Sequence, residues 1–487
     1  MKIFDALTRA RTALALAGLM ALSGCAVNVP REAEVRTQLP ATARWAASVW
    51  GAAIPGQGTG DEPSDGSGVV SGVGSGVGSG VGSGAAPAEA SVGASVGTSP
   101  PRVLTAEGAV RLAFGENPRA RLLRAEFLQE MAAVDAAAAA GGVSWSWSRL
   151  RPEAGLAQLA LALSVPLEDW LTLPARRRQA YWDRAAAAQR AGWETLQLEH
   201  EVRIAWATAV GMAQRSAELA TAAEVAGLEA ELASRYHDAG NLARAEWQAH
   251  ELQAGEALGA AAEASVAAAI ARATLATLLG LPSTDPRLLL PEQLPALPQI
   301  PSADTERTAA LAAQALRQRL DLRAARSAVT ARLLEAARAR RWSKLPALQV
   351  GVESEREPDG ERRRGPALEG EWSPVRVAEA GLATATVNAA QAQAELLAVQ
   401  VVNEVTLRTQ AYRRAVELAN LQSERLVPLQ EKKLSESLKR YNYMLEGPFA
   451  PLEERRHGAA MAALASEWQL AAWVAFQELQ QALGDAP

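Results

Sequence analysis

The sequence predicts a mainly α-helical protein with a small β part, built by duplication of one helix/β-hairpin/helix unit. Of the 487 residues, 49% are apolar by type but only 5% are aromatic, so alanine dominates the apolar content. The chain also repeats itself once, with a period of about 204 residues, which indicates duplication of a whole structural unit. Finally, two pairs of short segments alternate apolar and polar residues, the pattern of β-strands.

Charge and hydropathy exclude several classes of protein. A formal net charge of -5 argues against binding nucleic acid through a basic face. The mean hydropathy of -0.05 excludes a polytopic helical membrane protein, because each span needs about 20 consecutive apolar residues. The mean hydropathy does not exclude a membrane β-barrel, because apolar and polar residues alternate along its strands and their hydropathies cancel.

The N-terminus has the layout of a secretory signal. Three basic residues precede an apolar run at residues 13–22, which ends in Leu-Ser-Gly-Cys at the single cysteine, Cys25. This ending resembles a bacterial lipobox, which implies a signal peptide at 1–24 and a lipidated Cys25 as the first mature residue. Ala26, which is not Asp, then implies sorting to the outer membrane. The alternative is an ordinary secretory signal followed by an unmodified cysteine.

Residues 25–101 are predicted to be a flexible tether. Gly, Ser and Val alternate almost perfectly at 66–84, and such a composition cannot bury enough surface to offset its ordering entropy. The glycines do not match the spacing of a phosphate-binding loop. The rest of the chain divides into a first unit at 102–300 and a second at 301–487.

The two units align at matching landmarks. The landmarks of the first unit are Asn117, the segment Ser164-Val165-Pro166, Arg235-Tyr236 and Gly280. Those of the second unit are Arg319, the segment Trp372-Ser373-Pro374, Arg440-Tyr441 and Gly484.

Each unit contains one predicted β-hairpin. Residues 143–148 and 159–163 alternate on either side of a turn. In the second unit, residues 348–353 and 368–372 do the same around Pro358-Asp359-Gly360. Strands of eight to ten residues, close to the roughly 9–11 of a tilted membrane crossing, fit a barrel wall.

Helix lengths give the strongest geometric indication. Residues 166–240 and 374–447 each correspond to about 110 Å of helix at roughly 1.5 Å per residue. The helices expected at 107–140 and 241–280 add up to the same length, as do those at 308–342 and 447–484. We therefore expect two short helices, end to end, to lie beside one long antiparallel helix in each unit.

These features together resemble the TolC-like outer-membrane efflux proteins, over residues 104–487. The segments that carry the resemblance are Asn117-Pro118, Asp321-Leu322-Arg323, Leu279-Gly280-Leu281-Pro282 and Arg235-Tyr236-His237-Asp238-Ala239-Gly240. The resemblance implies that three chains each contribute four strands to one 12-stranded membrane barrel. It also implies that the long antiparallel helices form an α-barrel tunnel in the periplasm.

Five tryptophans lie in or beside the predicted strands and fit the aromatic girdle of a barrel: Trp145, Trp147, Trp170, Trp342 and Trp372. The alternative for each is a place in an ordinary core. A short first hairpin loop and the long tether depart from the family pattern.

Residues 440–449 resemble the turn of family members linked to copper and other heavy-metal resistance. The potential metal ligands do not support a link to metals, because the four His and six Met are dispersed along the chain without a pair at helical spacing. We therefore expect no metal site and no cofactor.

If the tunnel interpretation holds, three sets of residues carry the function, two implied by the resemblance and one by strand alternation. The tips that dock a periplasmic adaptor are Gly240, Asn241, Leu242, Gly447, Pro448 and Phe449, although plain helix termination by Gly and Pro explains them too. A periplasmic constriction would involve Glu246, Glu453 and Glu454, for which a solvated helix face is the alternative. If Val350, Val352, Leu368 and Trp372 face lipid, alternation sends four glutamates into the lumen: Glu353, Glu355, Glu369 and Glu371.

No hydrolase elbow, P-loop, zinc-protease motif or zinc cluster is present, so the sequence does not predict an enzyme. We expect a homotrimeric, lipid-anchored outer-membrane channel that works with a periplasmic adaptor (a membrane fusion protein) and an inner-membrane transporter. It would be a passive export duct for small solutes, with metal cations among the candidate solutes. The alternative is a periplasmic lipid-anchored helical scaffold or adaptor without a channel.

Overall fold

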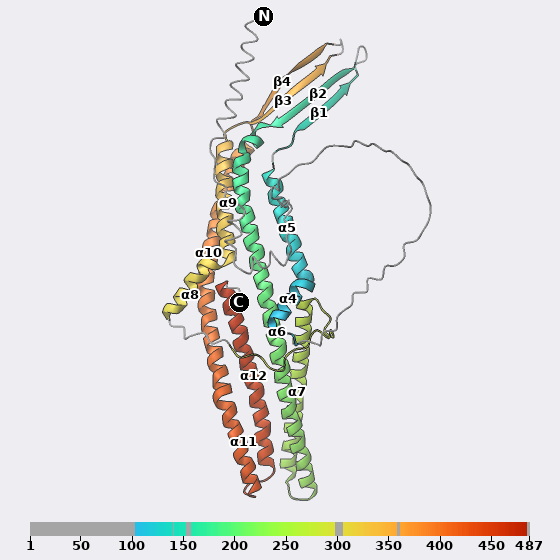
Figure 1. The fold of residues 1–487 in the computed structure, drawn as a ribbon, viewed down its shortest axis with the longest axis vertical. Coiled ribbons are helices and arrows are strands. Elements are labelled where there is room, and N and C mark those ends of the chain that lie inside the picture. The colour runs from blue at the N-terminus through green and yellow to red at the C-terminus, as the bar shows by residue number, and fades with distance from the viewer. Residues whose placement is uncertain (1–102, 140, 152–156, 298–304, 358–360, 485–487) are drawn as a thin grey trace, which may run out of the picture.

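The computed structural model describes residues 103–139, 141–151, 157–297, 305–357 and 361–484. The expected signal peptide, Cys25 and the expected tether lie outside the described residues. The described residues form an elongated molecule with a β-sheet at one end and two helical turns at the other (Figure 1).

The two halves contain the same order of elements. The first half consists of α4 (Ala106–Glu116), α5 (Pro118–Ala138), β1 (Ser144–Leu150), β2 (Gln158–Pro166), α6 (Leu167–Asp238) and α7 (Arg244–Leu279). The second half consists of α8 (Thr305–Gln318), α9 (Leu320–Trp342), β3 (Ala347–Arg356), β4 (Arg362–Glu371), α10 (Val375–Asn420), the π-helix η1 (Leu421–Leu426), α11 (Val427–Asn442) and α12 (Phe449–Leu483). The duplicated helix/hairpin/helix fold that the sequence predicts is confirmed.

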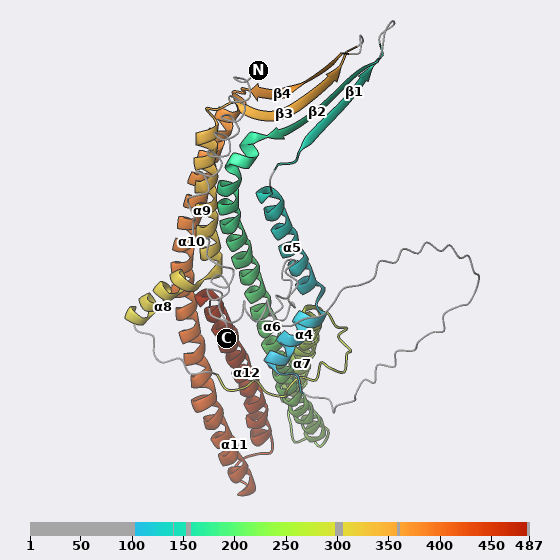
Figure 2. The same cartoon turned by 45° about the horizontal axis from the view of Figure 1, so that its top comes forward.

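Both expected long helices are present, and shorter helices lie beside them. Helix α6 runs unbroken for 72 residues, with α5 beside its strand-end half and α7 beside the other half (Figures 1 and 2). In the second half, α9 and α12 pack along α10 in the same way, and α11 continues it. The π-helix η1 precedes Pro428, whose missing N–H cannot complete the α-helical hydrogen-bond ladder.

Two expected helices are broken, which corrects the sequence analysis. The expected helix at 107–140 is divided at Asn117, whose extended backbone (ψ 124°) precedes a proline that disfavours helical geometry at this position. The Asn117 side chain then caps α5 by accepting a hydrogen bond from the Arg119 amide. The expected helix at 308–342 is divided at Arg319, also extended (ψ 125°).

The cores lie near the middle of the molecule, where α4 and α8 pack on the long helices. In the first half, Leu198, Val202 and Val210 of α6 are buried against Leu275 and Leu279 of α7. The indole of Trp206 donates a hydrogen bond to the Leu104 carbonyl at 2.8 Å. Buried alanines fill much of the remaining contact, which lets the helix backbones approach closely.

The second half has its own smaller core, and the connection between the halves is attached to both. Val401, Val405 and Leu479 are buried between α10 and α12. After α7 the chain crosses to the second half, where Trp473 of α12 donates to the Pro295 carbonyl at 2.9 Å. The two halves therefore form one packed body near the middle of the molecule.

The four strands form one antiparallel sheet in the order β1-β2-β3-β4. Trp145 pairs with Leu163, Leu163 with Val352, and Val352 with Pro366, so one level of the sheet can be followed across all four strands. Within the described residues, β1 and β4 are edge strands with one side unpaired. The sheet thus brings the hairpins of the two halves side by side.

Candidate functional site

The two faces of the sheet differ sharply in chemistry. Because side chains alternate along a strand, the register assigns every residue to a face. The apolar face carries Trp145, Trp147, Leu159, Leu161, Leu163, Val165, Val350, Val352 and Leu368. Most of these large side chains are exposed in the single chain. A contiguous exposed apolar surface of this kind is typical of an interaction with lipid or protein.

The opposite face is polar and acidic. The register brings all four expected lumen glutamates, Glu353, Glu355, Glu369 and Glu371, to this face. Ser146, Ser148 and Ser164 share it on the first hairpin. The Glu355 carboxylate accepts a hydrogen bond from Gln158 and lies opposite Arg363.

The expected girdle tryptophans lie on the apolar face of β1 or near the end of the sheet that joins the helices. Trp145 and Trp147 belong to β1, and Trp372 follows β4 directly. Trp170 lies in the first turn of α6 and Trp342 ends α9, near the base of the sheet. All except Trp342 are largely exposed.

The first helix turn is closed by glycine. Gly240 has a left-handed backbone (φ 76°), its amide donates to the His237 carbonyl, and the Asn241 amide donates to the Tyr236 carbonyl. This is the hydrogen-bond pattern of a Schellman motif, which satisfies carbonyls at a helix end. Gly240 and Asn241 are exposed, whereas Leu242 is half-buried.

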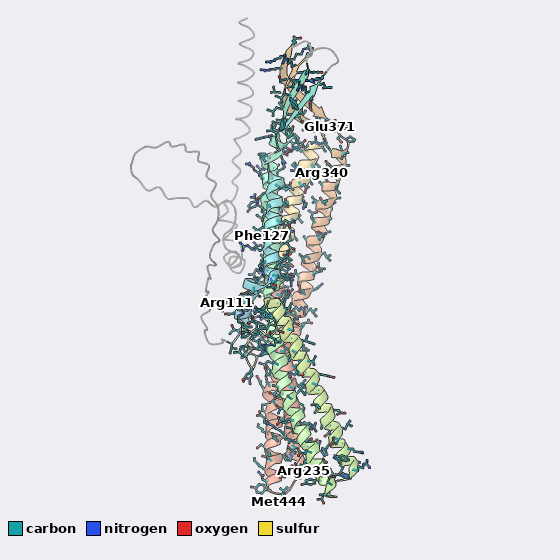
Figure 3. The ribbon with its side chains drawn as sticks, turned by 90° about the vertical axis from the view of Figure 1, so that its right-hand side faces the viewer. Arg111, Phe127, Arg235, Arg340, Glu371 and Met444 are labelled. Atoms are coloured by element: carbon teal, nitrogen blue, oxygen red, sulfur yellow. The ribbon has the colours of Figure 1, made fainter. Side chains whose placement is uncertain are left out.

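The second turn is closed by Met444 and not by Gly447. Met444 has φ 60°, its amide donates to the Tyr441 carbonyl, and the Leu445 amide donates to the Arg440 carbonyl. A non-glycine residue in this conformation carries strain, which is often found at functional positions. Met444 is 92% exposed and lies at the end of the molecule opposite Glu371 (Figure 3).

Sequence reasoning missed the apolar character of the second turn. Tyr443, Met444 and Leu445 are all strongly exposed, although large apolar side chains are normally covered. The available signal was this run of three large residues just before Gly447, since a solvated turn usually contains small polar residues. Gly447 itself is exposed, and Pro448 is half-buried beside it.

Phe449 is a contact between the two turns. Its ring lies 4.8 Å from the ring of His250 and 5.6 Å from that of Tyr236, measured between centroids. Nearby, the Glu229 carboxylate is buried and accepts a hydrogen bond from Arg456 Nε at 3.3 Å. Burial raises the pKa of Glu229, and the positive charge of Arg456 only partly opposes this. These contacts join α6 and α7 to α12.

The three expected constriction residues have different surroundings. Glu246 and Glu453 are exposed. Glu454 is largely covered, with 15% of its side chain exposed, and it pairs with Lys433 of α11 at 2.8 Å. Burial disfavours the Glu454 carboxylate, but hydrogen bonds from Lys433 and Gln430 outweigh it and lower its pKa.

Within the described residues, no three His, Cys, Asp or Glu side chains gather to hold a metal ion. Three of the four histidines, His237, His250 and His457, lie in or near the helix tips. The imidazole of His237 stacks on Trp247 and contacts the Leu242 carbonyl at 3.0 Å, which is a structural arrangement.

Comparisons with known proteins give a consistent result at the level of structure. No family model and no curated protein matches the chain. Among solved structures, the Campylobacter jejuni CmeC outer-membrane channel matches with a TM-score of 0.64 and 14% identity, over 78% of this chain and 85% of that one. The outer-membrane protein VceC from Vibrio cholerae matches with a TM-score of 0.62 and 16% identity, over 78% and 96% of the two chains.

The outer-membrane channel OprN is similar to the same extent, with a TM-score of 0.61 and 17% identity over 78% of this chain and 89% of OprN. At these identities the likeness concerns the fold. The chain therefore has the fold of these outer-membrane channels, which agrees with the fold that the TolC-like resemblance in its sequence predicts.

Proposed function

We propose that the protein is the outer-membrane channel of a tripartite efflux system and a passive export duct for small solutes. The observation that carries this proposal is a sheet with one exposed apolar face and one acidic face, placed at the end of long helical hairpins. A barrel wall needs such a sheet, because one side contacts lipid and the other contacts water.

The surfaces that the single chain leaves uncovered support a homotrimer. The edge strands β1 and β4 present unpaired backbone groups, which pairing with neighbouring chains would satisfy. Exposed apolar side chains also follow the outer helices: Leu252, Leu258, Val266 and Ile270 on α7, and Leu382, Leu396, Val399 and Leu407 on α10. Helix α7 is long and apolar enough to cross a membrane by length and composition alone, and burial against a neighbouring chain explains that composition.

The size of the purified mature protein tests the proposal. In detergent we expect a heat-sensitive trimer from the outer-membrane fraction that conducts ions in planar bilayers. A water-soluble monomer that needs no detergent would overturn the proposal.

The acidic face is proposed to line the lumen and to favour cations. Threefold assembly would stack rings of negative charge, and such rings favour cations in other pores. We expect that changing Glu353, Glu369 and Glu371 to Gln lowers the cation-to-anion permeability ratio in bilayers. Glu355 contributes less because Arg363 lies opposite it. Glu107→Gln, in the first turn of α4 far from the strands, is the control and leaves the ratio unchanged.

The two helix turns are proposed to dock a periplasmic adaptor, which itself joins an inner-membrane transporter. Met444 and Leu445 provide an exposed apolar tip, and Gly240, Asn241 and Leu242 form the neighbouring turn. We expect Met444→Asp to abolish assembly with the adaptor while single-channel conductance stays normal. Unchanged assembly of Met444→Asp with the adaptor would contradict a docking role.

Two further features complete the proposal. Glu246 and Glu453 are the exposed candidates for the periplasmic constriction, since Glu454 is engaged with Lys433.

Lipidation of Cys25 would anchor the N-terminus in the outer membrane, and Cys25→Ser should remove palmitate labelling while barrel insertion continues. Processing of the parent that is insensitive to globomycin would contradict the lipid anchor.

A further inference from the structure

The charged residues of the four strands are sorted between the two faces of the sheet. All four glutamates of the strands belong to the polar face. Four of the five arginines belong to the opposite, apolar face: Arg149, Arg356, Arg362 and Arg364. The exception, Arg363, shares the acidic face and pairs with Glu357 at 2.8 Å.

These four arginines, here called the arginine belt, gather at the hairpin end of the sheet. The register aligns Arg149, Leu159, Arg356 and Arg362 at one level across the strands. The next level toward the helices contains Trp147, Leu161, Ser354 and Arg364. The level after that is wholly apolar: Trp145, Leu163, Val352 and Pro366. The arginine belt therefore forms a rim on an apolar band.

Within the described residues, no ion pair involves a member of the arginine belt. Arg356 and Arg362 are directly opposite each other across β3 and β4, an arrangement in which like charges repel. The buried Nε of Arg356 has no hydrogen-bond acceptor among the described atoms. An anionic ligand would relieve both the repulsion and the missing hydrogen bond.

We propose that the arginine belt binds the phosphate groups of lipid headgroups in the outer leaflet. This inference rests on the proposed channel function, which sets the apolar face against lipid and the hairpin ends at the outer surface. Guanidinium groups hold phosphate through paired hydrogen bonds. The neighbouring apolar levels would contact the acyl chains of the same lipid, which favours a phosphorylated lipid over a soluble anion.

The triple arginine in β4 offers a matched pair of variants. Arg362→Gln/Arg364→Gln removes two charges from the arginine belt, whereas Arg363→Gln removes one charge from the opposite face of the same strand. The experiment uses the full mature protein in a neutral detergent. Binding of diphosphoryl lipid A is titrated by native mass spectrometry, with phosphatidylcholine as the reference lipid.

We expect the parent to bind diphosphoryl lipid A in preference to phosphatidylcholine. The double variant should bind it about 30-fold more weakly, from roughly 1 kcal/mol per arginine near an anionic lipid surface. Arg363→Gln should stay within about twofold of the parent. An unchanged affinity in the double variant, or an equal loss in Arg363→Gln, would overturn the proposal.

A second double variant, Arg149→Gln/Arg356→Gln, repeats the test on β1 and β3 and should weaken binding by a similar factor. Planar-bilayer conductance of every variant separates this inference from the channel proposal. Normal conductance with unchanged lipid binding rejects only the arginine belt, whereas a parent that neither trimerises nor conducts rejects the channel.

Discussion

In each half of the molecule, the glycine that ends one helix packs against the break between two other helices. We call this contact the junction of that half, and the two junctions differ in the side chain at the break. In the first half, Gly280 ends α7 in a left-handed conformation and lies against the break between α4 and α5. In the second half, Gly484 ends α12 in the same conformation and lies against the break between α8 and α9. The residue at the break, Asn117 or Arg319, donates a hydrogen bond to a carbonyl two residues before that glycine. Duplication has therefore kept the backbone and changed the side chain.

The junction of the second half contains ion pairs, and its side chain contacts helices of both halves. Arg319 is 5% exposed and pairs with Asp321 at 2.8 Å and with Glu404 of α10 at 2.6 Å. Its guanidinium also lies over the ring of Trp193 of α6, 4.7 Å from the ring centre. Among the described residues, the Asn117 side chain accepts a hydrogen bond from the Arg119 amide and donates one to the Leu278 carbonyl of α7. Arg319 thus joins both long helices, and Asn117 joins only the parts of its own half.

The helix tips repeat this contrast. In the first half, the turn between α6 and α7 is supported by His237 stacked on Trp247, with ring centres 5.1 Å apart. In the second half, Glu454 of α12 pairs with Lys433 of α11. The contrast at the tips is one of degree, because Arg235 also pairs with Glu231 in the first tip and Phe449 of the second tip packs on Tyr236 and His250.

The largest expected effect comes from the glycines at the junctions. A Cβ at Gly280 would lie 2.9 Å from the Glu116 carbonyl oxygen and 3.0 Å from the Asn117 Cα, both backbone atoms. With the cost of a positive φ added, Gly280→Ala should lower the free energy of unfolding by about 4 kcal/mol. Gly484→Ala should cost somewhat less, because a Cβ there would lie 3.0 Å from one backbone atom, the Arg319 Cα, and its nearest contact, at 2.8 Å, is the side-chain Cγ of Arg319.

Denaturant unfolding in detergent, followed by circular dichroism, checks this order. Gly227→Ala in α6 is the control, because its Cβ would meet no atom within 4 Å and alanine favours the helix. Equal losses at Gly280 and Gly484 would mean that the two junctions are equivalent despite their different neighbours.

The next largest effect is expected from the side chains at the two helix breaks, Arg319 and Asn117. Arg319→Ala removes the ion-pair partner of two carboxylates, Asp321 and Glu404, and should cost about 3 kcal/mol, the low end for a buried pair because Glu404 is partly exposed. Asn117→Ala removes a helix cap and one hydrogen bond, for a loss of about 1–2 kcal/mol. The same unfolding measurement compares them, and a larger loss for Asn117→Ala would reverse the contrast drawn here.

The smallest effects are pH dependences of opposite sign. The lowered pKa of Glu454 adds stability that is present above the unfolded-state pKa, near 4.5, and is lost as pH falls through the folded-state pKa. Glu454→Gln should therefore destabilise more at pH 7 than at pH 4, by about 1 kcal/mol for a pair with an exposed lysine.

Glu229 should behave in the opposite way. Burial raises its pKa, so its contribution is fully present below pH 4.5 and is lost as pH rises through the folded-state pKa. The free energy of unfolding of Glu229→Gln should therefore rise relative to that of the parent as pH rises. Parallel pH profiles for the two variants would show that the two carboxylates share one environment.

Much of the fold follows from periodicity and spacing. The long helices and the four strands were predictable because the spacing of apolar residues changes from that of a strand to that of a helix at Pro166 and Pro374. The expected turns at residues 151–155 and 358–360 lie mostly outside the described residues. The break at Asn117 was also legible in principle, since a proline follows it. The local sequence marks Arg319 less clearly, because only Asp321 among the partners of its side chain is near in sequence, and the others are 85 and 163 residues away.

Some features of the candidate sites were predictable from the sequence, and others depend on tertiary packing. Strand alternation by itself placed Glu353, Glu355, Glu369 and Glu371 on one face, because side-chain direction is a property of the strand. That Gly447 does not close the second turn, that Phe449 packs between the turns and that Glu454 is covered by Lys433 depend on which helices meet. Their roles in docking and constriction stay predictions.

The sequence by itself determined the duplicated order of elements, their lengths and the two chemistries of the sheet, since these arise from neighbours along the chain. Only the tertiary structure decided how the strands align, and thereby that Arg149, Arg356 and Arg362 meet at one level. It also decided that one junction is held by Asn117 and the other by Arg319. The physical reason is that register and ion pairing depend on residues that are distant in sequence and meet only after the two halves have packed.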